Sequence, residues 1–570
     1  MCRNDGAIMV KKVIAAVLLS FLLSCDRERN AIDNETVDED DQSCKTVEIT
    51  PALPVKPVLP DVAEIPEYSE GFDKCKVLPE ITENRLTLGE GCFKGCIFAN
   101  ELLEISGAGS DKTIIVCDNP EKNGVIEVQK SSEVIVRNLS ISGKTRGVFV
   151  NNNSKLQIEN IAIFNVEKGG INVCGGESLC GSEVTVTGSK ISDVIPDAQS
   201  GVSYGISMGP GLLTVQNSQL SGFNSFAISL WGEPASKVYA DMNNVTISDI
   251  YGGKTDFEGT AFYSEGLSEV SIKKVSIEKA ATSFIYISST NQTETSTVVL
   301  EDISVEKITD SDKKQGGFVF EGNIKAELKR VEIIKSRGNG IFSNGSEIIA
   351  EDITISGVTS DKTGENGFGV SLFDGSISEF NRIVMTEAEI AGIFMDGKCI
   401  AEIEDFSVSN TKPDSAGEFG LGAAIQEQAE IIMKNGIINE NLECGIMAIN
   451  GKVEINNVEI KNTMQRKCIE LNGCSFAPGI PFGHGISLYQ NSQLVFGNIS
   501  IFNNRNGMNI ENSKIYQKNE GAASFVKNVS AVNAWNIEQS QILENAFVNS
   551  EFCDNGSVFT TDVQPVRDGL

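Results

Sequence analysis

Basic side chains are scarce in this sequence. Lys and Arg together number 47 against 78 Asp and Glu, and the formal net charge is −31. Nucleic acids are bound through basic faces that neutralise phosphates, so this balance excludes them as partners. The same balance opposes unassisted binding of polyanionic sugars, although a calcium ion could bridge the two negative surfaces. No other cofactor is expected.

Histidine is scarcer still, since His484 is the only one in the chain. Cysteine is not scarce, but CxxC spacing is missing and no histidine lies near the cysteines, so no zinc site is expected. The LxxLxL pattern of leucine-rich repeats is also absent. These absences remove the commonest metal site and one repeat class from consideration.

A glycine followed by an alternating apolar run returns through most of the chain. Such anchors stand at Gly147, Gly205, Gly340, Gly369, Gly392, Gly445, Gly485 and Gly507. Between them the chain reads like VTISDI or VEIIKS, with apolar residues at every second place, and this period of two indicates strands. Strands that return at a regular interval predict a solenoid.

The interval between anchors is informative. Steps of about 22 residues alternate with longer steps of about 30 to 35, and about 22 residues suffice for three short strands and three corners. The pattern resembles the right-handed parallel β-helix of the pectin-lyase-like class over residues 87–559, and LLEISGAGSDKTIIV resembles the first coils of that class. The resemblance implies an all-β, single-stranded solenoid of about 17 coils, a rod of about 80 Å at ~4.8 Å per coil.

Asparagine is expected at many corners of this solenoid. It tolerates left-handed backbone geometry and hydrogen-bonds its own backbone, so it suits a tight, repeated turn. The expected corner residues are Asn153, Asn344, Asn491 and Asn512. We interpret them as structural and assign them no catalytic role.

The first 25 residues predict export. MVKKVIAAVLLSFLLSC begins at Met9 with two lysines and an apolar core about half as long as the ~20 residues that span a bilayer. Its ending, LLSC, resembles a bacterial lipobox. The resemblance implies that Cys25 receives a diacylglycerol and anchors the chain to the cell envelope, at the outer membrane or cell surface. An ordinary secretory signal with an incidental cysteine is the alternative.

Residues 26–68 show no apolar period. DNETVDEDD is almost wholly acidic, and PALPVKPVLPDV is proline-rich. Such a composition cannot bury a core, and proline keeps it extended. We expect a disordered tether that holds the rod off the membrane, followed by a β-helix with an N-terminal and a C-terminal cap over residues 69–570.

The cysteines of an exported chain predict disulfides. The candidate pairs, which bracket GGESL and IELNG, are Cys174 with Cys180 and Cys468 with Cys474. Further cysteines cluster between residues 75 and 117, where the rod needs a cap. Structural disulfides are favoured over a metal site for this cluster.

His484 stands in FGHGISL, which resembles the GHG motif of polygalacturonases, enzymes that share the β-helix fold. The resemblance implies three partner aspartates from NTD and DD motifs, but the preceding QRKCIELNGCSFAPGIPF contains none. Because acid–base hydrolysis needs paired carboxylates, no catalytic residue is assigned. Arg146, Arg337 and Arg505 precede anchors without an aspartate cluster beside them, and we expect them at solvent-exposed corners.

Every second coil carries an insertion before its anchor, at residues 194–204, 251–259, 309–316, 359–368 and 411–421. Stacking would place these loops ~9–10 Å apart along one edge of the rod. Each contains an aspartate: Asp197, Asp256, Asp310, Asp361 and Asp414. They are either good turn residues or a ridge that binds a ligand.

Two functions remain open at this point. The first is a membrane-anchored, non-catalytic scaffold or binding rod for a polysaccharide or a surface protein. The second is a polysaccharide lyase or glycoside hydrolase. A compact group of acids with a base in one groove distinguishes them, since fold alone does not decide function. The absence of any such motif favours the first.

Overall fold

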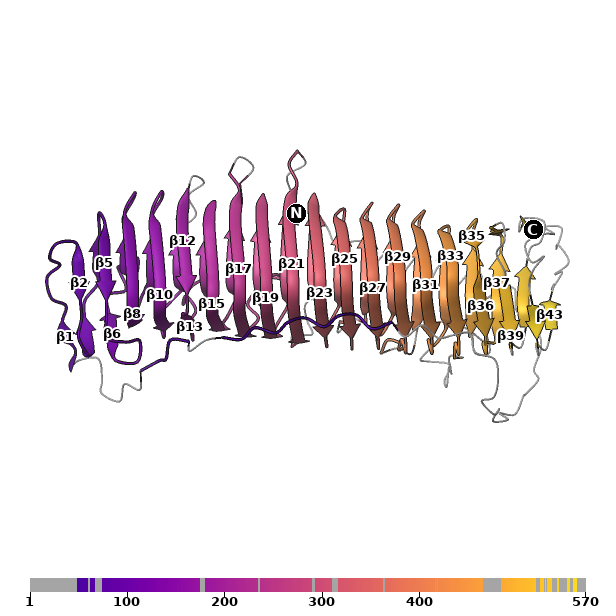
Figure 1. Ribbon diagram of the computed structural model, residues 1–570, viewed down its shortest axis with the longest axis horizontal. Coiled ribbons are helices and arrows are strands. Elements are labelled where there is room, and N and C mark those ends of the chain that lie inside the picture. Colours follow the sequence, from indigo (N-terminus) through magenta and orange to yellow (C-terminus); the bar gives the residue numbers. More distant parts are fainter. Residues whose placement is uncertain are drawn as a thin grey trace.

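The chain forms one long rod of stacked coils (Figure 1). The computed structural model describes residues 49–59, 62–66, 74–174, 180–233, 236–289, 293–309, 316–361, 364–415, 417, 419–464, 483–518, 523–526, 528, 530–535, 541–542, 551–553 and 557–560. Within these ranges no α-helix occurs, and none of the described residues forms a helix that could cross a membrane. The all-β prediction is confirmed.

Each coil contributes to two parallel sheets that run the length of the rod. Sheet A contains β1 (Lys76–Val77), β2 (Arg85–Thr87), β3 (Gly91–Lys94), β5 (Leu103–Ser106), β6 (Thr113–Cys117), β8 (Glu133–Gly143), β10 (Lys155–Phe164), β12 (Ser182–Thr187), β13 (Lys190–Ser192), β15 (Gly211–Phe223), β17 (Val238–Ile250), β19 (Ser268–Ala280), β21 (Ser296–Ile308), β23 (Ile324–Ile334), β25 (Glu347–Ser356), β27 (Ile377–Thr386), β29 (Ile400–Ser409), β31 (Glu430–Asn439), β33 (Lys452–Lys461), β35 (Gln493–Phe496), β36 (Ile499–Phe502), β38 (Lys514–Gln517), β39 (Ala523–Val526), β41 (Gln541–Ile542) and β42 (Glu551–Cys553).

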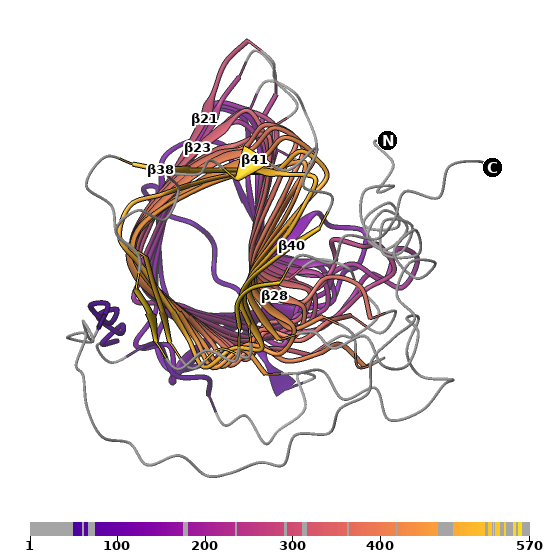
Figure 2. The same cartoon turned by 90° about the vertical axis from the view of Figure 1, so that its right-hand side faces the viewer.

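Sheet B contains β4 (Ile97–Ala99), β7 (Gly124–Val128), β9 (Arg146–Val150), β11 (Gly169–Val173), β14 (Tyr204–Met208), β16 (Phe226–Trp231), β18 (Thr260–Glu265), β20 (Ser283–Ser289), β22 (Phe318–Gly322), β24 (Asn339–Asn344), β26 (Phe368–Phe373), β28 (Ala391–Asp396), β30 (Leu421–Gln426), β32 (Cys444–Ile449), β34 (His484–Tyr489), β37 (Asn506–Glu511), β40 (Ser530–Trp535) and β43 (Ser557–Thr560). Every ladder within the two sheets is parallel, and each strand pairs with its counterpart in the next coil. Seen along its axis, the rod is a single ring of strands (Figure 2). The predicted right-handed parallel β-helix is thereby confirmed, since parallel crossovers are almost always right-handed.

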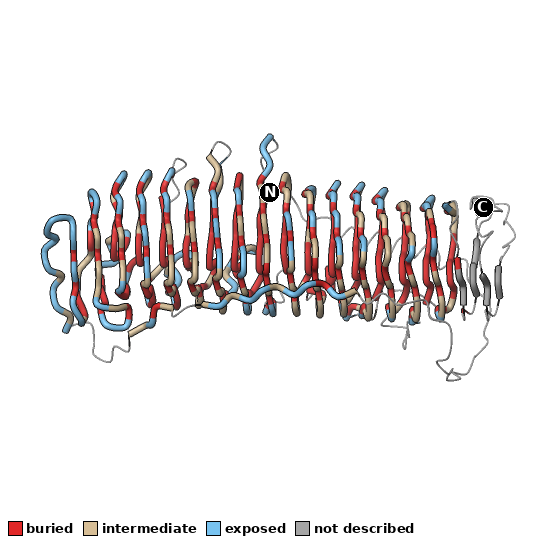
Figure 3. The backbone as a smooth tube through the Cα atoms, viewed as in Figure 1, coloured by how far each residue is buried: buried red, intermediate tan, exposed pale blue. Residues whose placement is uncertain are grey.

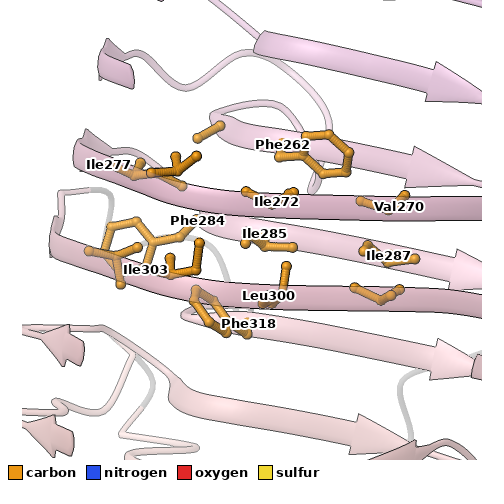
Figure 4. Close-up of a cluster of buried hydrophobic side chains, with 14 of the residues drawn as sticks. Phe262, Val270, Ile272, Ile277, Phe284, Ile285, Ile287, Leu300, Ile303 and Phe318 are labelled. Atoms are coloured by element: carbon orange, nitrogen blue, oxygen red, sulfur yellow. The ribbon is translucent and has the colours of Figure 1, made fainter. Parts of the chain in front are cut away.

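Stacked aliphatic and aromatic ladders fill the ring. On sheet B, Ile228 pairs in register with Phe262, which pairs with Ile285 and then with Phe318, and all four side chains are buried. Residues of sheet A such as Ile272 and Leu300 face them across the ring (Figure 4). The buried residues form one continuous core along the rod (Figure 3). Truncating one of these to alanine is expected to cost about 2–5 kcal/mol.

The anchor glycines are required by close stacking of the coils. A Cβ built on Gly340 would lie 2.4 Å from the carbonyl oxygen of Gly369 and 2.7 Å from Cγ2 of Ile355, and neither can move freely. Gly369 meets the carbonyl oxygen of Gly392 in the same way. In three further coils, spacing along the sequence puts the anchors at Gly124, Ser283 and Ala423. The register corrects each by one residue, because the stacked positions are Val125, Phe284 and Gly422.

Left-handed residues mark the corners, as expected. Asn153, Asn491 and Asn512 have φ of 55°, 65° and 48°. At Asn344 the expectation was one residue early, because Gly345 takes the left-handed position with φ of 70°. A second row of left-handed residues, one per coil, bends the long strands of sheet A and is called the corner track here. Its members include Asn217, Asn244, Lys274, Asp302, Arg330, Asp352, Arg382, Asp405 and Asn435.

Three disulfides stabilise the N-terminal coils. They join Cys75 with Cys92, Cys96 with Cys117, and Cys174 with Cys180. The prediction of disulfides is confirmed, and bridges of this kind indicate an exported protein. Cys468 and Cys474 lie outside the described residues. Two other cysteines, Cys399 and Cys444, are buried free thiols.

The proline-rich segment does not behave as the expected disordered tether over its described part. Residues 49–59, called the strap here, lie along the outside of the rod and cross several coils (Figures 1 and 3). The amide groups of Ala52 and Val55 donate hydrogen bonds to carboxylates of Asp352 and Asp302. The strap has no hydrophobic core of its own. It is ordered because its amide groups donate hydrogen bonds to carboxylates at the corners of the rod. Residues 26–48, and with them Cys25, lie outside the described residues.

Candidate functional site

All five insertions occupy the same connection, the one that leads from a sheet A strand to the next sheet B strand. They precede β14, β18, β22, β26 and β30, while the intervening coils connect β15 to β16, β19 to β20 and β27 to β28 without one. The loops therefore project from one side of the rod in alternate coils (Figure 2). Asp310 falls in the part of the third loop that lies outside the described residues.

The aspartates of these loops serve mainly as turn residues. The Asp197 carboxylate accepts hydrogen bonds from the amides of Gln199 and Ser200 and pairs with Lys168 at 3.1 Å. These contacts hold the pKa of Asp197 well below its usual range. Asp361 accepts from the amide of Glu365 at 2.9 Å and is buried. Both carboxylates thus accept hydrogen bonds from amides of their own loops, which fits the turn explanation better than a ligand ridge.

Asp256 and Asp414 differ from each other in exposure. Asp256 is exposed, whereas Asp414 is buried and its carbonyl accepts a turn hydrogen bond from the amide of Gly417. The described aspartates therefore do not present a uniform surface to a ligand. The ligand ridge remains a prediction, and the geometry gives it no direct support.

The loops instead cover the outer face of sheet B with aromatic side chains. Phe257, from the second loop, contacts Tyr263 and Tyr286, with ring centroids 6.0 and 5.1 Å away. Phe368 stacks on Phe394 with centroids 4.5 Å apart. Tyr204 and Phe419, from the first and fifth loops, each join an apolar cluster outside the main core. An aromatic residue one to four positions before an anchor was the sequence signal that could have predicted this aromatic cover.

Two rows of side chains point outward from sheet B. The row under the loops is buried except at Phe342, which is partly buried, and consists of Ser229, Tyr263, Tyr286, Val319, Phe342, Ser371 and Phe394. The next row, two residues further along each strand, is partly open to solvent. It is called the outer strip here and consists of Trp231, Glu265, Ser288, Glu321, Asn344, Phe373 and Asp396. This strip is the candidate site.

Two tyrosine–glutamate pairs organise the strip. The Tyr263 hydroxyl donates to Glu265 at 2.6 Å, and the Tyr286 hydroxyl donates to Glu321 at 2.5 Å. The two tyrosine rings stack with centroids 5.3 Å apart and planes 6° from parallel. Burial raises the pKa of both phenols, and the neighbouring carboxylates raise it further. Burial likewise raises the pKa of Glu321 above its ordinary value.

Aromatic surface lies beside these pairs. Trp231 is 44% exposed, and its ring packs against Tyr263 with centroids 5.3 Å apart. At the other end of the strip, burial and the charges of Glu427 and Asp374 raise the pKa of Asp396 to about 6. The strip therefore combines a flat apolar face with carboxylates held by neighbouring residues.

His484 does not belong to this site. It is the first residue of β34, is buried, and pairs in register with Cys444 and Asn506. Burial and the positive charge of Arg505 lower the pKa of the imidazole to about 3, so it is neutral at physiological pH. A neutral imidazole in register between a thiol and an amide gives no sign of acid–base catalysis at this coil position.

The three arginines before the anchors are less exposed than expected. Arg146 is half-buried, and its Nε donates to the Tyr204 hydroxyl at 3.3 Å. Arg337 and Arg505 are half-buried as well, and burial lowers the pKa of Arg505. The expectation of solvent-exposed corners is therefore met only in part, since all three residues are partly buried.

A metal ion would need several donors close together. Among the residues that the structure describes, no group of three or more His, Cys, Asp or Glu side chains is arranged to hold one. Calcium as a bridge to an anionic sugar remains a prediction.

Comparisons with known proteins bear on the fold only. No protein-family model matches the chain. No curated protein sequence matches it either. Among solved structures it is similar to a pectate lyase at 12% identity, with 62% of this chain and 71% of that chain covered and a TM-score of 0.23. A bacteriophage Phi29 gene product 12 N-terminal fragment matches at 11% identity over 83% and 88%, with a TM-score of 0.32. The catalytic domain of a family 87 α-1,3-glucanase matches at 12% identity over 84% and 70%, with a TM-score of 0.23. These likenesses are too distant to bear on function.

Proposed function

We propose that this protein is an exported, lipid-anchored rod that binds an extended glycan along the outer strip without cleaving it. The outer strip supports this proposal more than any other feature. It offers the exposed side chain of Trp231, and each of the next four coils adds one polar group: the carboxylate of Glu265, the hydroxyl of Ser288, the carboxylate of Glu321 and the amide of Asn344. Sugar rings present apolar C–H faces and polar edges, so an aromatic plane with convergent polar groups suits them.

The strip is also preorganised. Tyr263 and Tyr286 hold Glu265 and Glu321 by short hydrogen bonds, and the stacked rings are buried under the Phe257 loop. Side chains that are already immobile lose little conformational entropy on binding, which favours affinity. Repetition at ~4.8 Å per coil suits a polymer that lies along the rod.

A glycan array probed with the whole chain carrying Cys25→Ser tests the proposal, because this change removes the lipid that would cause non-specific adhesion. Trp231→Ala is expected to weaken binding of the best glycan at least about tenfold, as removal of an aromatic anchor commonly does. Tyr239→Ala is the matched control, because Tyr239 is 42% exposed but lies on sheet A. An equal loss of glycan affinity in both variants, or the absence of any bound glycan, contradicts the proposal. If the protein instead binds a surface protein through Trp231, that protein replaces the glycan as the ligand.

A glycoside hydrolase is the second candidate, and one observation favours it. Glu265 and Glu321 lie in the same row two coils apart, with Ser288 between them. Two coil steps are ~9–10 Å, at the upper end of the roughly 6.5–9.5 Å that separates the carboxyl groups of inverting enzymes. The raised pKa of Glu321 suits a general acid. Release of reducing ends from bound glycans, abolished by Glu321→Gln, would establish this activity in place of simple binding.

A further inference from the structure

The strap carries a strict repeat. Proline occupies positions 51, 54, 57 and 60, and the first three lie in the described part. Proline at every third place favours the polyproline II helix, which has three residues and a rise of about 9.3 Å per turn. Residues three apart therefore point in the same direction.

The prolines face the rod, and the residues after them bind it. Pro51 is buried and Pro54 and Pro57 are half-buried, whereas Leu53 and Val58 are 66% and 80% exposed. The amide groups of the three residues that follow the prolines donate to the corner track. The pairs are Ala52 to Asp352 Oδ1 at 3.1 Å, Val55 to Asp302 Oδ1 at 3.0 Å, and Val58 to Asn244 Oδ1 at 2.8 Å.

The acceptors occupy alternate coils. Asn244, Asp302 and Asp352 lie on β17, β21 and β25, with Lys274 and Arg330 at the intervening corners. Two coil steps span about 9.6 Å, which matches one polyproline II turn within a few tenths of an ångström. The strap and the rod thus share a common period, three residues to two coils.

The acceptors are themselves held in place. Arg330 donates to both carboxylate oxygens of Asp302, at 2.6 and 3.0 Å, and Arg382 does the same for Asp352 at 2.7 and 3.0 Å. The Asn244 amide also donates back to the carbonyl oxygen of Val58 at 2.8 Å. Acceptors fixed in this way need little reordering to receive a peptide.

We propose that the corner track from Asn244 to Asp352 is a binding site for proline-repeat peptides in the polyproline II conformation, and that the strap is its resident ligand. Three hydrogen bonds in phase, with prolines between them, recognise a segment of the form Pro-x-x-Pro-x-x-Pro. The site also holds the first described residues of the strap beside β25 rather than at the end formed by β1. This inference does not depend on the glycan-binding proposal.

The first test, in the full chain, asks whether the proline repeat of the strap must stay in phase with the coils of the rod. One glycine inserted between Pro54 and Val55 puts the two halves of the strap out of step with the coils. A three-residue insertion there, a second Val-Lys-Pro, keeps the proline repeat and the phase, and moves Ala52 to Asp405, the next left-handed acidic corner two coils on. Hydrogen–deuterium exchange of the strap should be at least about tenfold faster with one inserted residue and unchanged with three. Unchanged exchange with one inserted residue overturns the proposal.

The second test asks whether the track binds in trans. The full chain carrying Pro51→Gly, Pro54→Gly and Pro57→Gly leaves the track free, and a fluorescent peptide TPALPVKPVLP is titrated against it. Saturable binding is expected. No saturation at several millimolar peptide, the range of an intramolecular effective concentration, would mean that covalent linkage alone holds the strap.

Site specificity is read from two matched alanine variants in that same background. Asp302→Ala should abolish peptide binding. Asp405→Ala is the control, because its φ of 53° is close to the 59° of Asp302 and it makes no hydrogen bond to the described strap. Equal affinities for the two variants overturn the assignment of the track.

Discussion

Tyr286 donates its hydroxyl hydrogen to the carboxylate of Glu321 over 2.5 Å, although the two residues belong to successive coils. The pair joins the buried row of sheet B to the outer strip. The Tyr286 ring stacks on Tyr263 and contacts Phe257 of the second loop at a tilt of 57°, so one side chain joins the loop, the sheet and the candidate site.

Removing that hydroxyl should therefore affect stability. Tyr286→Phe leaves the partly buried Glu321 carboxylate without its donor, which is expected to cost about 1–3 kcal/mol. Urea unfolding at neutral pH measures the loss. Tyr239→Phe, at a solvent-exposed position of β17, should change the unfolding midpoint very little, and equal midpoints for both variants would contradict the role assigned to the pair.

The raised pKa of Asp396 predicts how stability varies with pH. Because the folded pKa of about 6 exceeds the ordinary 3.8, the folded state holds the proton more tightly, and stability falls as pH rises from about 4 to 6. Asp396→Asn should raise the melting temperature at pH 7.5 and leave it unchanged near pH 3.5. Since the carboxyl is partly solvated, we expect the free energy of unfolding to rise by about 1 kcal/mol, less than the free energy that corresponds to the whole pKa shift. The exposed Asp241→Asn is the control, and a gain that does not depend on pH would rule out this cause.

The anchor glycines predict a sharp steric effect. Gly340→Ala places a methyl group 2.4 Å from a backbone carbonyl oxygen and should cost at least the ~1–3 kcal/mol typical of overpacking. Gly89→Ala has no atom within 4 Å of the new Cβ and should be neutral. Thermal unfolding of both variants decides the matter, and equal melting temperatures would show that the coils can separate to admit the methyl group.

Lipid attachment at Cys25 remains a prediction from the sequence. Cys25→Ser should release the protein from membranes and abolish incorporation of a fatty-acid probe. Cys399→Ser is a suitable control, because that thiol is buried in the rod. Unchanged labelling of the Cys25 variant would leave only the ordinary secretory signal.

His484 is predicted to be dispensable for any activity found. Its imidazole is buried and neutral, since burial and the positive charge of Arg505 lower its pKa to about 3. His484→Ala should leave a measured hydrolase rate within a few-fold of wild type. A hundredfold loss, about 2.7 kcal/mol of barrier, would restore the polygalacturonase interpretation.

Local pattern was sufficient to predict the fold. The period of two along segments such as β17 and β19 decides which side chains face inward, because alternation along a strand is a local property of the backbone. The return of glycine likewise predicted the coil. Spacing alone puts two anchors at Ser283 and Ala423, one residue from the stacked positions Phe284 and Gly422, since the corner geometry of each coil, and not its length, sets the register.

Contacts between distant residues could not be predicted in this way. The proline repeat of the strap is visible in the sequence, but its acceptors Asn244, Asp302 and Asp352 lie 186, 247 and 300 positions away from the amides they bind. The outer strip is likewise drawn from one residue per coil. The sequence by itself determined the strands, the coil period and the solenoid, because these follow from neighbours along the chain. Only the tertiary structure decided which side chains gather on one face, because stacking brings together residues that no local pattern connects.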